Sequence, residues 1–254
     1  MDEIVLNYET TGDGPPLLLV HGLGISFNIW KNLIPLLRPH FTLVMVELPG
    51  IGKSPVVCGS YLSSSVDALV RLRLKLGLGK WDVFGYSTGS RIAETYVRMD
   101  AAHVGRAIFL CPVLIGMPQL LFLRLGFWID GFFPTTGTWL LRGWRLRFFI
   151  SLFGFNLTPN PHTDEWYCQI SAVPVDVLKE TLKIIAKLGL NSYSIPVPFS
   201  TIWGEADIIP VTPRKRQPHD YFVKSNHAAP VIAADEVSAL ITRLLRDSDI
   251  VPYK

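Results

Sequence analysis

The sequence predicts an α/β fold with a mostly parallel sheet, flanked by helices and interrupted by a helical insertion. Three observations support this prediction. Short apolar runs alternate with helical patterns over the first part of the chain, as is typical of strand–helix–strand units in parallel sheets. The apolar run Trp81–Phe84 leads directly into Gly85–Gly89 and then into a helical pattern. The alternation stops near residue 116, and strand patterns resume at Phe199.

The expected strands are short and mostly apolar throughout, which favours burial on both faces of a sheet. They are Glu3–Glu9 (an alternating edge strand), Leu17–Val20, Phe41–Val46, Trp81–Phe84, Ala107–Leu110, Phe199–Trp203 and Tyr221–Lys224. A turn at Thr10–Pro16, rich in glycine and proline, separates the first two. The expected helices between and after the strands are Ile29–Leu37, Ser64–Leu76, Ser90–Met99 and Asp235–Arg246.

The insertion contains helical patterns and no good strand. Its expected helices are Pro118–Ile129, Thr138–Phe153, Thr163–Ala172 and Pro174–Leu188. Thr163 is suited to a helix N-cap, and Pro174 to a first helical turn. We therefore expect a core domain formed by residues 1–115 and 199–254, interrupted by an all-helical insertion formed by residues 116–198.

Composition excludes several classes of protein. With 254 residues, 49% of them hydrophobic and 18% charged, the chain is globular and not disordered. The net charge of +3 is small, and the compact basic cluster Arg214–Arg216 is interpreted as a solvated loop or helix end, so nucleic acid is not an expected partner. The three cysteines, Cys58, Cys111 and Cys168, are odd in number and widely spaced, which fits neither a disulfide framework nor a metal knuckle.

The expected location is the cytoplasm, with peripheral attachment to a membrane as an open alternative. The cysteine pattern indicates a reducing compartment, and the acidic start at Asp2 and Glu3 is unlike a signal peptide. The longest uncharged stretch, between Arg106 and Arg124, is interrupted by two prolines and falls short of the roughly 20 apolar residues of a spanning helix. A transmembrane segment is therefore not expected.

Ser87, in Gly85-Tyr86-Ser87-Thr88-Gly89, is the candidate nucleophile. A serine hydroxyl attacks efficiently only when it is exposed, aimed and paired with a base. A sharp strand-to-helix turn lifts the side chain above the sheet, and flanking glycines permit the close approach of strand and helix. The motif alone is weak, but its place between an apolar strand and a helix makes it specific.

His227 is the candidate general base. Where a nucleophile occupies such a turn, the acid and then the histidine follow it along the chain. Of the six histidines, only His162, His219 and His227 follow Ser87. His162 falls in the insertion and His219 opens the last strand, at the wrong end of the sheet, whereas His227 follows that strand in a loop.

Asp207 is the candidate acid, with Glu205 as the fallback. Both follow the strand Phe199–Trp203, at the edge of the sheet where His227 is expected. The carboxylate would hold the imidazole tautomer and stabilise the imidazolium. The backbone N–H groups of Thr88 and Leu23 are the expected oxyanion donors, one at the start of the helix after Ser87 and one in the His21-Gly22-Leu23-Gly24 loop.

Together these stretches resemble the α/β-hydrolase superfamily. The pieces that carry the resemblance are His21-Gly22-x-Gly24, Trp30 with Leu36-Leu37, Glu47-Leu48-Pro49-Gly50-x-Gly52-x-Ser54, the Ser87 motif, Trp203-Gly204-x-x-Asp207, and His227. The resemblance covers most of residues 3–113 and 199–246 and implies a serine hydrolase with a Ser–His–Asp triad. It does not specify a substrate.

The chain departs from the family pattern at several positions. Glu47 stands where the family usually has Asp, and Asn226 replaces the commoner Gly before the histidine. The interval from Asp207 to His227 is short, which suggests a trimmed connection. Because the nucleophile is Ser and neither Asp nor Cys, dehalogenase, epoxide hydrolase and dienelactone hydrolase chemistry are not expected.

The resemblance implies that the insertion, residues 116–198, forms a cap, or lid, over the pocket. This predicted cap is rich in aromatic residues. Between Met117 and Phe155 these are Phe122, Phe127, Trp128, Phe132, Phe133, Trp139, Trp144, Phe148, Phe149, Phe153 and Phe155. Four arginines accompany them (Arg124, Arg142, Arg145 and Arg147), against Asp130 alone. Part of this set must pack on the core; the rest suggests either an apolar pocket roof or a face that contacts an anionic bilayer. Both alternatives indicate a hydrophobic substrate.

The expected activity is hydrolysis of a carboxylic ester with a hydrophobic or lipid-like character, through an acyl-enzyme. Acyl transfer, thioester hydrolysis and cleavage of a C–C bond use the same triad and remain alternatives, as does a binding protein that keeps the fold without turnover. No metal or other cofactor is expected, because the histidines and cysteines lack ligand spacing and Gly50–Ser54 matches only the end of a phosphate loop. The oligomeric state is open.

Overall fold

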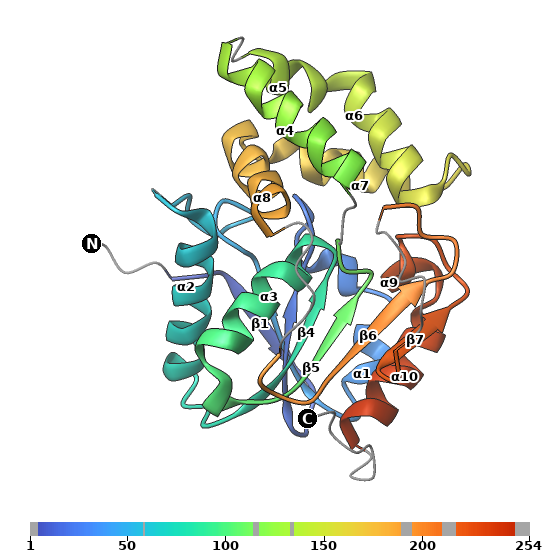
Figure 1. Ribbon diagram of the computed structural model, residues 1–254. Helices are drawn as coiled ribbons and strands as arrows, with labels where there is room; N and C mark the ends of the chain where they lie inside the picture. The colour runs from blue at the N-terminus through green and yellow to red at the C-terminus, as the bar shows by residue number, and fades with distance from the viewer. Residues whose placement is uncertain are drawn as a thin grey trace.

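A computed structural model describes residues 5–57, 59–113, 117–132, 135–188, 195–209 and 217–246. Its centre is a seven-stranded sheet in the order β1-β3-β2-β4-β5-β6-β7, with every pair parallel except β1 and β3 (Figure 1). The strands are β1 (Tyr8–Thr11), β2 (Pro16–Val20), β3 (Thr42–Val46), β4 (Trp81–Tyr86), β5 (Val104–Leu110), β6 (Phe199–Gly204) and β7 (Asp220–Val223). The prediction of a mostly parallel α/β sheet is confirmed.

Helices cover both faces of the sheet and form a separate layer beyond one edge of it. The helices of the core are η1 (Phe27–Trp30), α1 (Ile34–Leu37), α2 (Tyr61–Lys75), α3 (Thr88–Met99), η2 (Ala101–His103), α9 (Ala229–Ile232) and α10 (Ala234–Arg246). Helix α2 packs against α3, and α1 packs against α10 (Figure 1). The inner strands are apolar because both faces are covered: Leu17–Val20 are all buried.

The cap lies between β5 and β6 in sequence and above the carboxyl ends of the strands in space (Figure 1). Its helices are α4 (Met117–Phe132), α5 (Thr135–Leu140), α6 (Gly143–Phe149), the π-helical turn η3 (Ile150–Gly154), α7 (His162–Ala172) and α8 (Val175–Leu188). Helix α8 contacts α2 and α3 of the core. In the described part of the chain, no helix has the length and apolarity needed to cross a bilayer.

Several element boundaries differ from the predictions. The edge strand covers Tyr8–Thr11, so Thr10 and Thr11 pair with β3 instead of forming the turn, which begins at Gly12 with a positive φ. Residues 1–4 lie outside the described residues. The expected helix Ile29–Leu37 is two short pieces, since Pro35, in the first turn of α1, lacks an N–H group to continue a preceding helix.

One of the helices predicted in the cap is wrong. Thr138–Phe153, expected as one helix, is divided among α5, α6 and η3. Gly143, the first residue of α6, adopts φ +61, a left-handed conformation that separates α6 from α5. The helix expected at Ser64 begins earlier, at Tyr61, because the Ser60 hydroxyl accepts the Ser63 N–H and caps the first turn.

Candidate active site

Ser87 occupies a strained turn between β4 and α3. Its φ of 55° and ψ of −124° place a non-glycine residue in a region that L-residues rarely adopt. The turn is held by the Ser87 N–H, which donates to the Leu110 carbonyl oxygen of β5 at 3.0 Å. The neighbouring Ser90 hydroxyl donates to the Gly85 carbonyl oxygen at 2.8 Å. The backbone is thus fixed on both sides of the hydroxyl.

The two glycines of the motif permit this close packing. A Cβ added at Gly85 would lie 2.8 Å from both the Ser90 Cα and the Ala93 Cβ, so strand and helix could not approach as they do. A Cβ at Gly89 would overlap the carbonyl oxygen of His21 at the end of β2. The turn that carries Ser87 between β4 and α3, here called the elbow, therefore packs closely against the His21–Gly24 loop.

His227 joins the serine to an acid. Its Nε2 lies 2.8 Å from the Ser87 Oγ, and its Nδ1 lies 2.7 Å from the Asp207 Oδ2. His227 follows β7 and Asp207 follows β6, so parallel strands bring both to the edge of the sheet where β4 delivers Ser87 (Figure 1). All three residues are buried. The structure brings these three predicted residues together in spite of the short interval between Asp207 and His227.

Asp207, and not the fallback Glu205, contacts the histidine. Asp207 accepts the Ile209 N–H on Oδ1 at 3.0 Å, which leaves Oδ2 directed at His227. The side chain of Asp207 is 1% exposed, whereas Glu205 is an exposed residue. With Oδ2 accepting the Nδ1–H, the lone pair of the imidazole Nε2 faces the serine hydroxyl.

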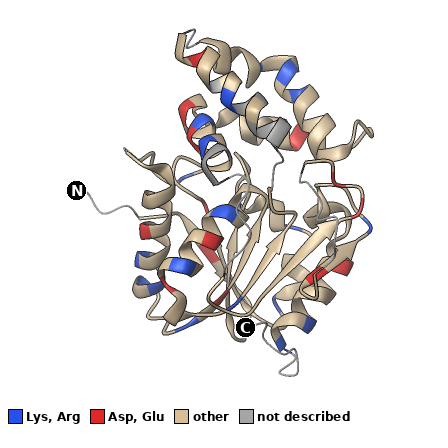
Figure 2. Ribbon diagram, viewed as in Figure 1, with Lys and Arg blue, Asp and Glu red and all other residues tan. Residues whose placement is uncertain are grey.

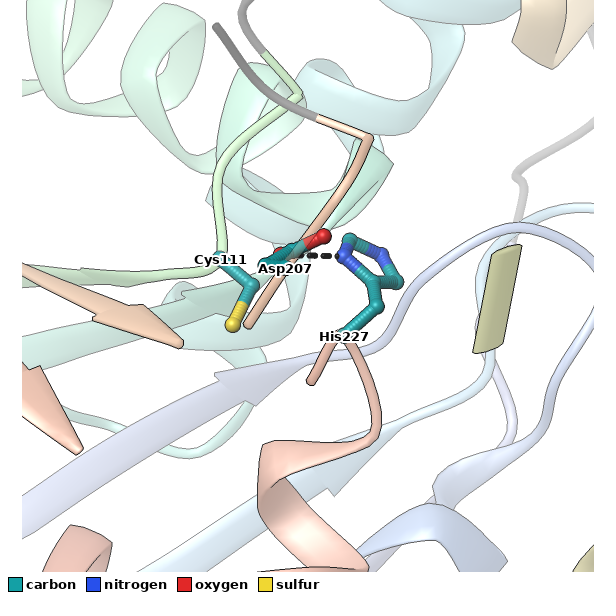
Figure 3. A group of neighbouring side chains, drawn as sticks. All are labelled: Cys111, Asp207 and His227. Carbon is teal, nitrogen blue, oxygen red and sulfur yellow. Dashed lines mark hydrogen bonds and ion pairs between the residues drawn. The ribbon is translucent and has the colours of Figure 1, made fainter. Parts of the chain in front are cut away.

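Cys111 is a contact of Asp207 that sequence reasoning did not find. It follows β5 directly, is fully buried, and adopts a positive φ of 44°. Figure 3 shows its side chain beside Asp207 and His227. Burial, and then the nearby charge of Asp207, raises the pKa of the Cys111 thiol well above its usual range, so the thiol stays protonated beside Asp207. The sequence signal was its position at the end of a central strand.

Tyr86 is a second residue that sequence reasoning missed. Its hydroxyl donates to the His227 carbonyl oxygen at 2.8 Å, and its ring lies 5.4 Å from the imidazole, centroid to centroid. Burial raises the pKa of the Tyr86 phenol, which therefore remains a donor. As the residue before Ser87, Tyr86 ties the elbow to the histidine loop. Its position next to Ser87 in the motif was the feature of the sequence that could have identified it.

The loop expected to supply an oxyanion donor lies beside the nucleophile. A Cβ at Gly22 would lie 3.0 Å from the Ser87 Cβ. His21 fixes this loop: its Nε2 accepts the Leu48 N–H at 2.9 Å, so Nδ1 carries the proton and donates to the Gly22 carbonyl oxygen at 2.8 Å. Burial lowers the pKa of His21 to about 4 and keeps it neutral. The oxyanion roles of Leu23 and Thr88 remain predictions.

Two departures from the family pattern have local roles in the structure. Glu47 is buried, and its Oε2 accepts the Asn7 side-chain amide at 2.8 Å and the Lys53 N–H at 2.7 Å. It therefore closes the loop between β3 and α2. The Asn226 side-chain oxygen accepts the Ala228 N–H at 3.0 Å and forms a turn across His227. Both substitutions stabilise loops around the site.

The cap covers the site with aliphatic side chains. A Cβ at Gly24 would lie 2.8 Å from Leu178 of α8 and 3.2 Å from Ile170 of α7, so both helices pack onto the loop next to Ser87. Both side chains are buried. The Gln169 side-chain oxygen also accepts the Ser26 N–H at 3.1 Å. The part of the cap that faces this loop is therefore apolar, with one polar anchor.

The aromatic residues of the cap are mostly directed elsewhere. Phe155 is fully buried against Trp166, but Trp128, Phe132, Trp139, Trp144, Phe148 and Phe153 are exposed. The side chains of Phe122, Phe127 and Phe133 lie outside the described residues, as do Cys58 and Arg214–Arg216. The interpretation of the aromatic stripe as a pocket roof is thus wrong for the six exposed residues.

Cys111, Asp207 and His227 lie close enough together for their donor atoms to be considered as metal ligands. One donor atom from each lies within 4.8 Å of the others (Figure 3). The imidazole Nδ1 is already bonded to Asp207, and the Cys111 thiol is protonated. A metal would need the deprotonated thiol and a free Nδ1, and would break the contact that orients His227. Asp207 and His227 therefore fit a hydrogen-bonded pair, with Cys111 as a neutral neighbour, better than a metal centre.

The chain is similar in sequence or structure to several known hydrolases. The chain is 27% identical over 225 residues to a soluble epoxide hydrolase of Corynebacterium sp. strain C12, covering 78% of this chain and 77% of that protein. It is 34% identical over 90 residues to a pimeloyl-[acyl-carrier protein] methyl ester esterase of Legionella pneumophila strain Corby, but this match covers only 35% of this chain and 37% of the esterase. A hydrolase from Pseudomonas aeruginosa PA01 has a similar structure, with a TM-score of 0.78 at 15% identity over 95% of this chain and 94% of that one.

The family model for the alpha/beta hydrolase fold matches residues 15–149, just over half of the chain. This segment contains the His21–Gly24 loop, the Ser87 elbow and the start of the cap. The likeness to the solved structure extends the same fold over the strands that carry Asp207 and His227. The chain therefore belongs to the alpha/beta hydrolase fold family.

Proposed function

We propose that the protein is a serine hydrolase that cleaves a carboxylic ester with an apolar acyl chain. The observation that carries the proposal is the bridge formed by His227, 2.8 Å from the Ser87 hydroxyl and 2.7 Å from the Asp207 carboxylate. This order of hydroxyl, imidazole and carboxylate is what nucleophilic catalysis by serine requires.

Each group of this hydrogen-bonded bridge has a role in the proposed reaction. The Ser87 Oγ attacks the ester carbonyl carbon while its proton passes to the His227 Nε2. The oxyanion is held by the Leu23 and Thr88 N–H groups. The C–O bond to the alcohol then breaks, and the alcohol takes the proton from Nε2, which leaves an acyl-serine. A water molecule, deprotonated by the same nitrogen, releases the acid and restores the serine.

A serine nucleophile is suited to ester hydrolysis and not to the epoxide hydrolysis for which the relative is named. Attack by a serine oxygen on an epoxide carbon would produce an ether, which has no carbonyl for water to attack. Attack on an ester gives an acyl-serine that water can cleave. The matched esterase is named for a carboxylic ester, and this supports the reaction class. The aliphatic contacts of Ile170 and Leu178 beside the Gly24 loop support an apolar acyl chain.

Labelling with a fluorophosphonate tests the nucleophile. We expect the wild type to be labelled and Ser87→Ala to be unlabelled, whereas Ser63→Ala, an exposed serine in α2, is labelled like the wild type. A wild type that is not labelled, or a Ser87→Ala variant labelled equally, would remove the proposal.

Hydrolysis of nitrophenyl esters tests the acid and the acyl preference. We expect Asp207→Asn to lower kcat by about 10³–10⁴-fold, because the amide cannot hold the required tautomer. Glu205→Gln is the matched control, and we expect it to retain activity. In a chain-length series, kcat/KM for the octanoate should exceed that for the acetate. A preference for the acetate would contradict the apolar acyl site without affecting the triad.

A further inference from the structure

Helix α4 presents an apolar face to solvent. Leu121, Leu125, Trp128 and Phe132 are spaced by four, three and four residues, so they form one stripe along the helix. Their exposed fractions are 58%, 53%, 63% and 66%. A helix on the surface of a globular protein normally turns such a stripe inward. This one is turned away from the protein.

The aromatic exposure continues over α5 and α6. Helix α5 contacts both α4 and α6, so the three form one outer cap, at the end of the molecule opposite α10 (Figure 1). Trp139 of α5 is 57% exposed and Trp144 of α6 is 71% exposed. The other four of the seven tryptophans are buried. Every exposed tryptophan of the protein is therefore in the outer cap.

The charge of the outer cap is basic (Figure 2). Residues 117–157 contain four arginines and one acid, Asp130, whose charge is offset by an ion pair with Lys179 of α8. The Arg145 guanidinium lies 4.1 Å from the Trp139 ring centroid and 5.4 Å from that of Trp144. Arg147 is half-exposed and pairs with Asp164 of α7. Aromatic and cationic groups are thus interleaved on one layer.

We propose that the outer cap docks on the surface of an anionic lipid bilayer. Tryptophan and phenylalanine enter the boundary between headgroups and acyl chains, while arginines contact anionic headgroups. A second copy of the chain would bring the same basic layer against itself, which charge disfavours. An anionic bilayer offers an apolar region to the exposed stripe of α4 and negative charge to the arginines of the outer cap.

The orientation follows from the fold. With α4–α6 on the bilayer, the sheet lies on the far side of the cap, and α7 and α8 lie between the bilayer and Ser87 (Figure 1). Attachment is peripheral, since no helix among the described residues qualifies to span a membrane. Docking does not depend on the esterase activity proposed above.

Vesicle binding with tryptophan quenching tests the proposal. Vesicles are made of brominated phosphatidylcholine with and without phosphatidylglycerol, and binding is measured by sedimentation and by fluorescence. We expect binding to the anionic vesicles, quenching of the exposed tryptophans, and weaker binding at high salt. Trp128→Ser/Phe132→Ser should weaken binding by about tenfold or more, because two large side chains no longer enter the interface.

The controls separate docking from folding and from dimerisation. Leu74→Ser, on the exposed side of α2 in the core, removes a similarly exposed apolar residue and should bind like the wild type. If the double variant fails to fold by circular dichroism, Leu121→Ser/Leu125→Ser tests the other end of the stripe. No binding to anionic vesicles, equal binding without phosphatidylglycerol, or an equal loss in Leu74→Ser would overturn the proposal. So would a dimer by light scattering that the double variant converts to a monomer.

Discussion

At the scale of single residues, the site depends on groups that hold the triad as well as on the triad itself. Tyr86 fixes the backbone at His227, and the protonated Cys111 thiol lies beside Asp207. Both side chains are buried. Their contribution is to keep the carboxylate and the imidazole in one arrangement, which is what catalysis by preorganised groups requires.

Cys111 is expected to act as a positioning residue. Cys111→Ala removes the polar S–H group next to the Asp207 carboxylate, so the carboxylate stabilises the protonated histidine more strongly and the acid limb of the kcat/KM profile moves up by about 0.3–0.5 pH units. Cys111→Ser keeps a protonated polar group at this position and should retain the wild-type profile. Identical pH profiles for the alanine variant and the wild type would contradict this role, even if the alanine variant is less stable.

His21 is expected to make folding stability depend on pH. Its pKa is about 4 in the folded protein against 6.5 for the free side chain, so the unfolded chain binds the extra proton between these values. Stability is therefore fully present above pH 6.5 and falls as the pH drops towards 4, by about 3 kcal/mol in total.

Urea denaturation at pH 7 and pH 4.5 checks the role of His21. We expect the free energy of unfolding of the wild type to fall more between these pH values than that of His21→Gln, by about 2–3 kcal/mol, because the variant has no imidazole to protonate. Equal falls in the two proteins would show that His21 is not the group responsible.

At the scale of elements, the elbow shows why its glycines are needed. The first turn of α3 rests on the end of β2, and Gly89 meets the His21 carbonyl oxygen where any Cβ would overlap it. Since the obstacle is backbone and not a flexible side chain, the strand and helix would have to separate. The same close approach places the Ser87 hydroxyl next to the His21–Gly24 loop.

Gly89→Ala is therefore expected to lower the free energy of unfolding by about 3 kcal/mol and to abolish fluorophosphonate labelling. Gly79→Ala is the matched control, because a Cβ there meets nothing within 4 Å, and it should change stability by less than about 0.5 kcal/mol. Denaturant curves and labelling report the two effects separately. A Gly89→Ala variant with wild-type stability and labelling would refute the packing argument.

At the scale of the whole molecule, the cap is joined to the core mainly by apolar contact. Leu178 is fully buried and packs at Gly24, and Ile170 packs beside it. An ion pair between Lys31 of the core and Glu165 of the cap is partly exposed, with side-chain exposures of 42% and 33%. Exposed ion pairs contribute little to stability, whereas burial of a leucine contributes several times more.

Leu178→Ala is expected to destabilise the protein by about 3 kcal/mol, because a cavity opens between cap and core. Lys31→Ala, which removes the ion pair at the same junction, should cost less than about 1 kcal/mol. Thermal and urea unfolding of both variants measures the difference. A larger loss in Lys31→Ala than in Leu178→Ala would show that charge, and not packing, holds the cap.

The parallel α/β architecture could be predicted from the sequence alone, as could Ser87, His227 and an acid, Asp207 with Glu205 as the fallback, after the strand Phe199–Trp203. These follow from local patterns: apolar runs of strand length, a glycine-flanked serine between strand and helix, and polar residues directly after strands. The order of elements then implies that the ends of parallel strands meet at one edge.

Three features became visible only in the folded molecule: which acid faces His227, that Cys111 and Tyr86 lie against the triad, and that six of the described cap aromatics point outward. Aromatic residues at helical spacing predict an apolar face, but not whether that face turns inward or outward. The direction depends on how α4–α6 pack on α7 and α8, and this packing is set by contacts between residues far apart in the chain.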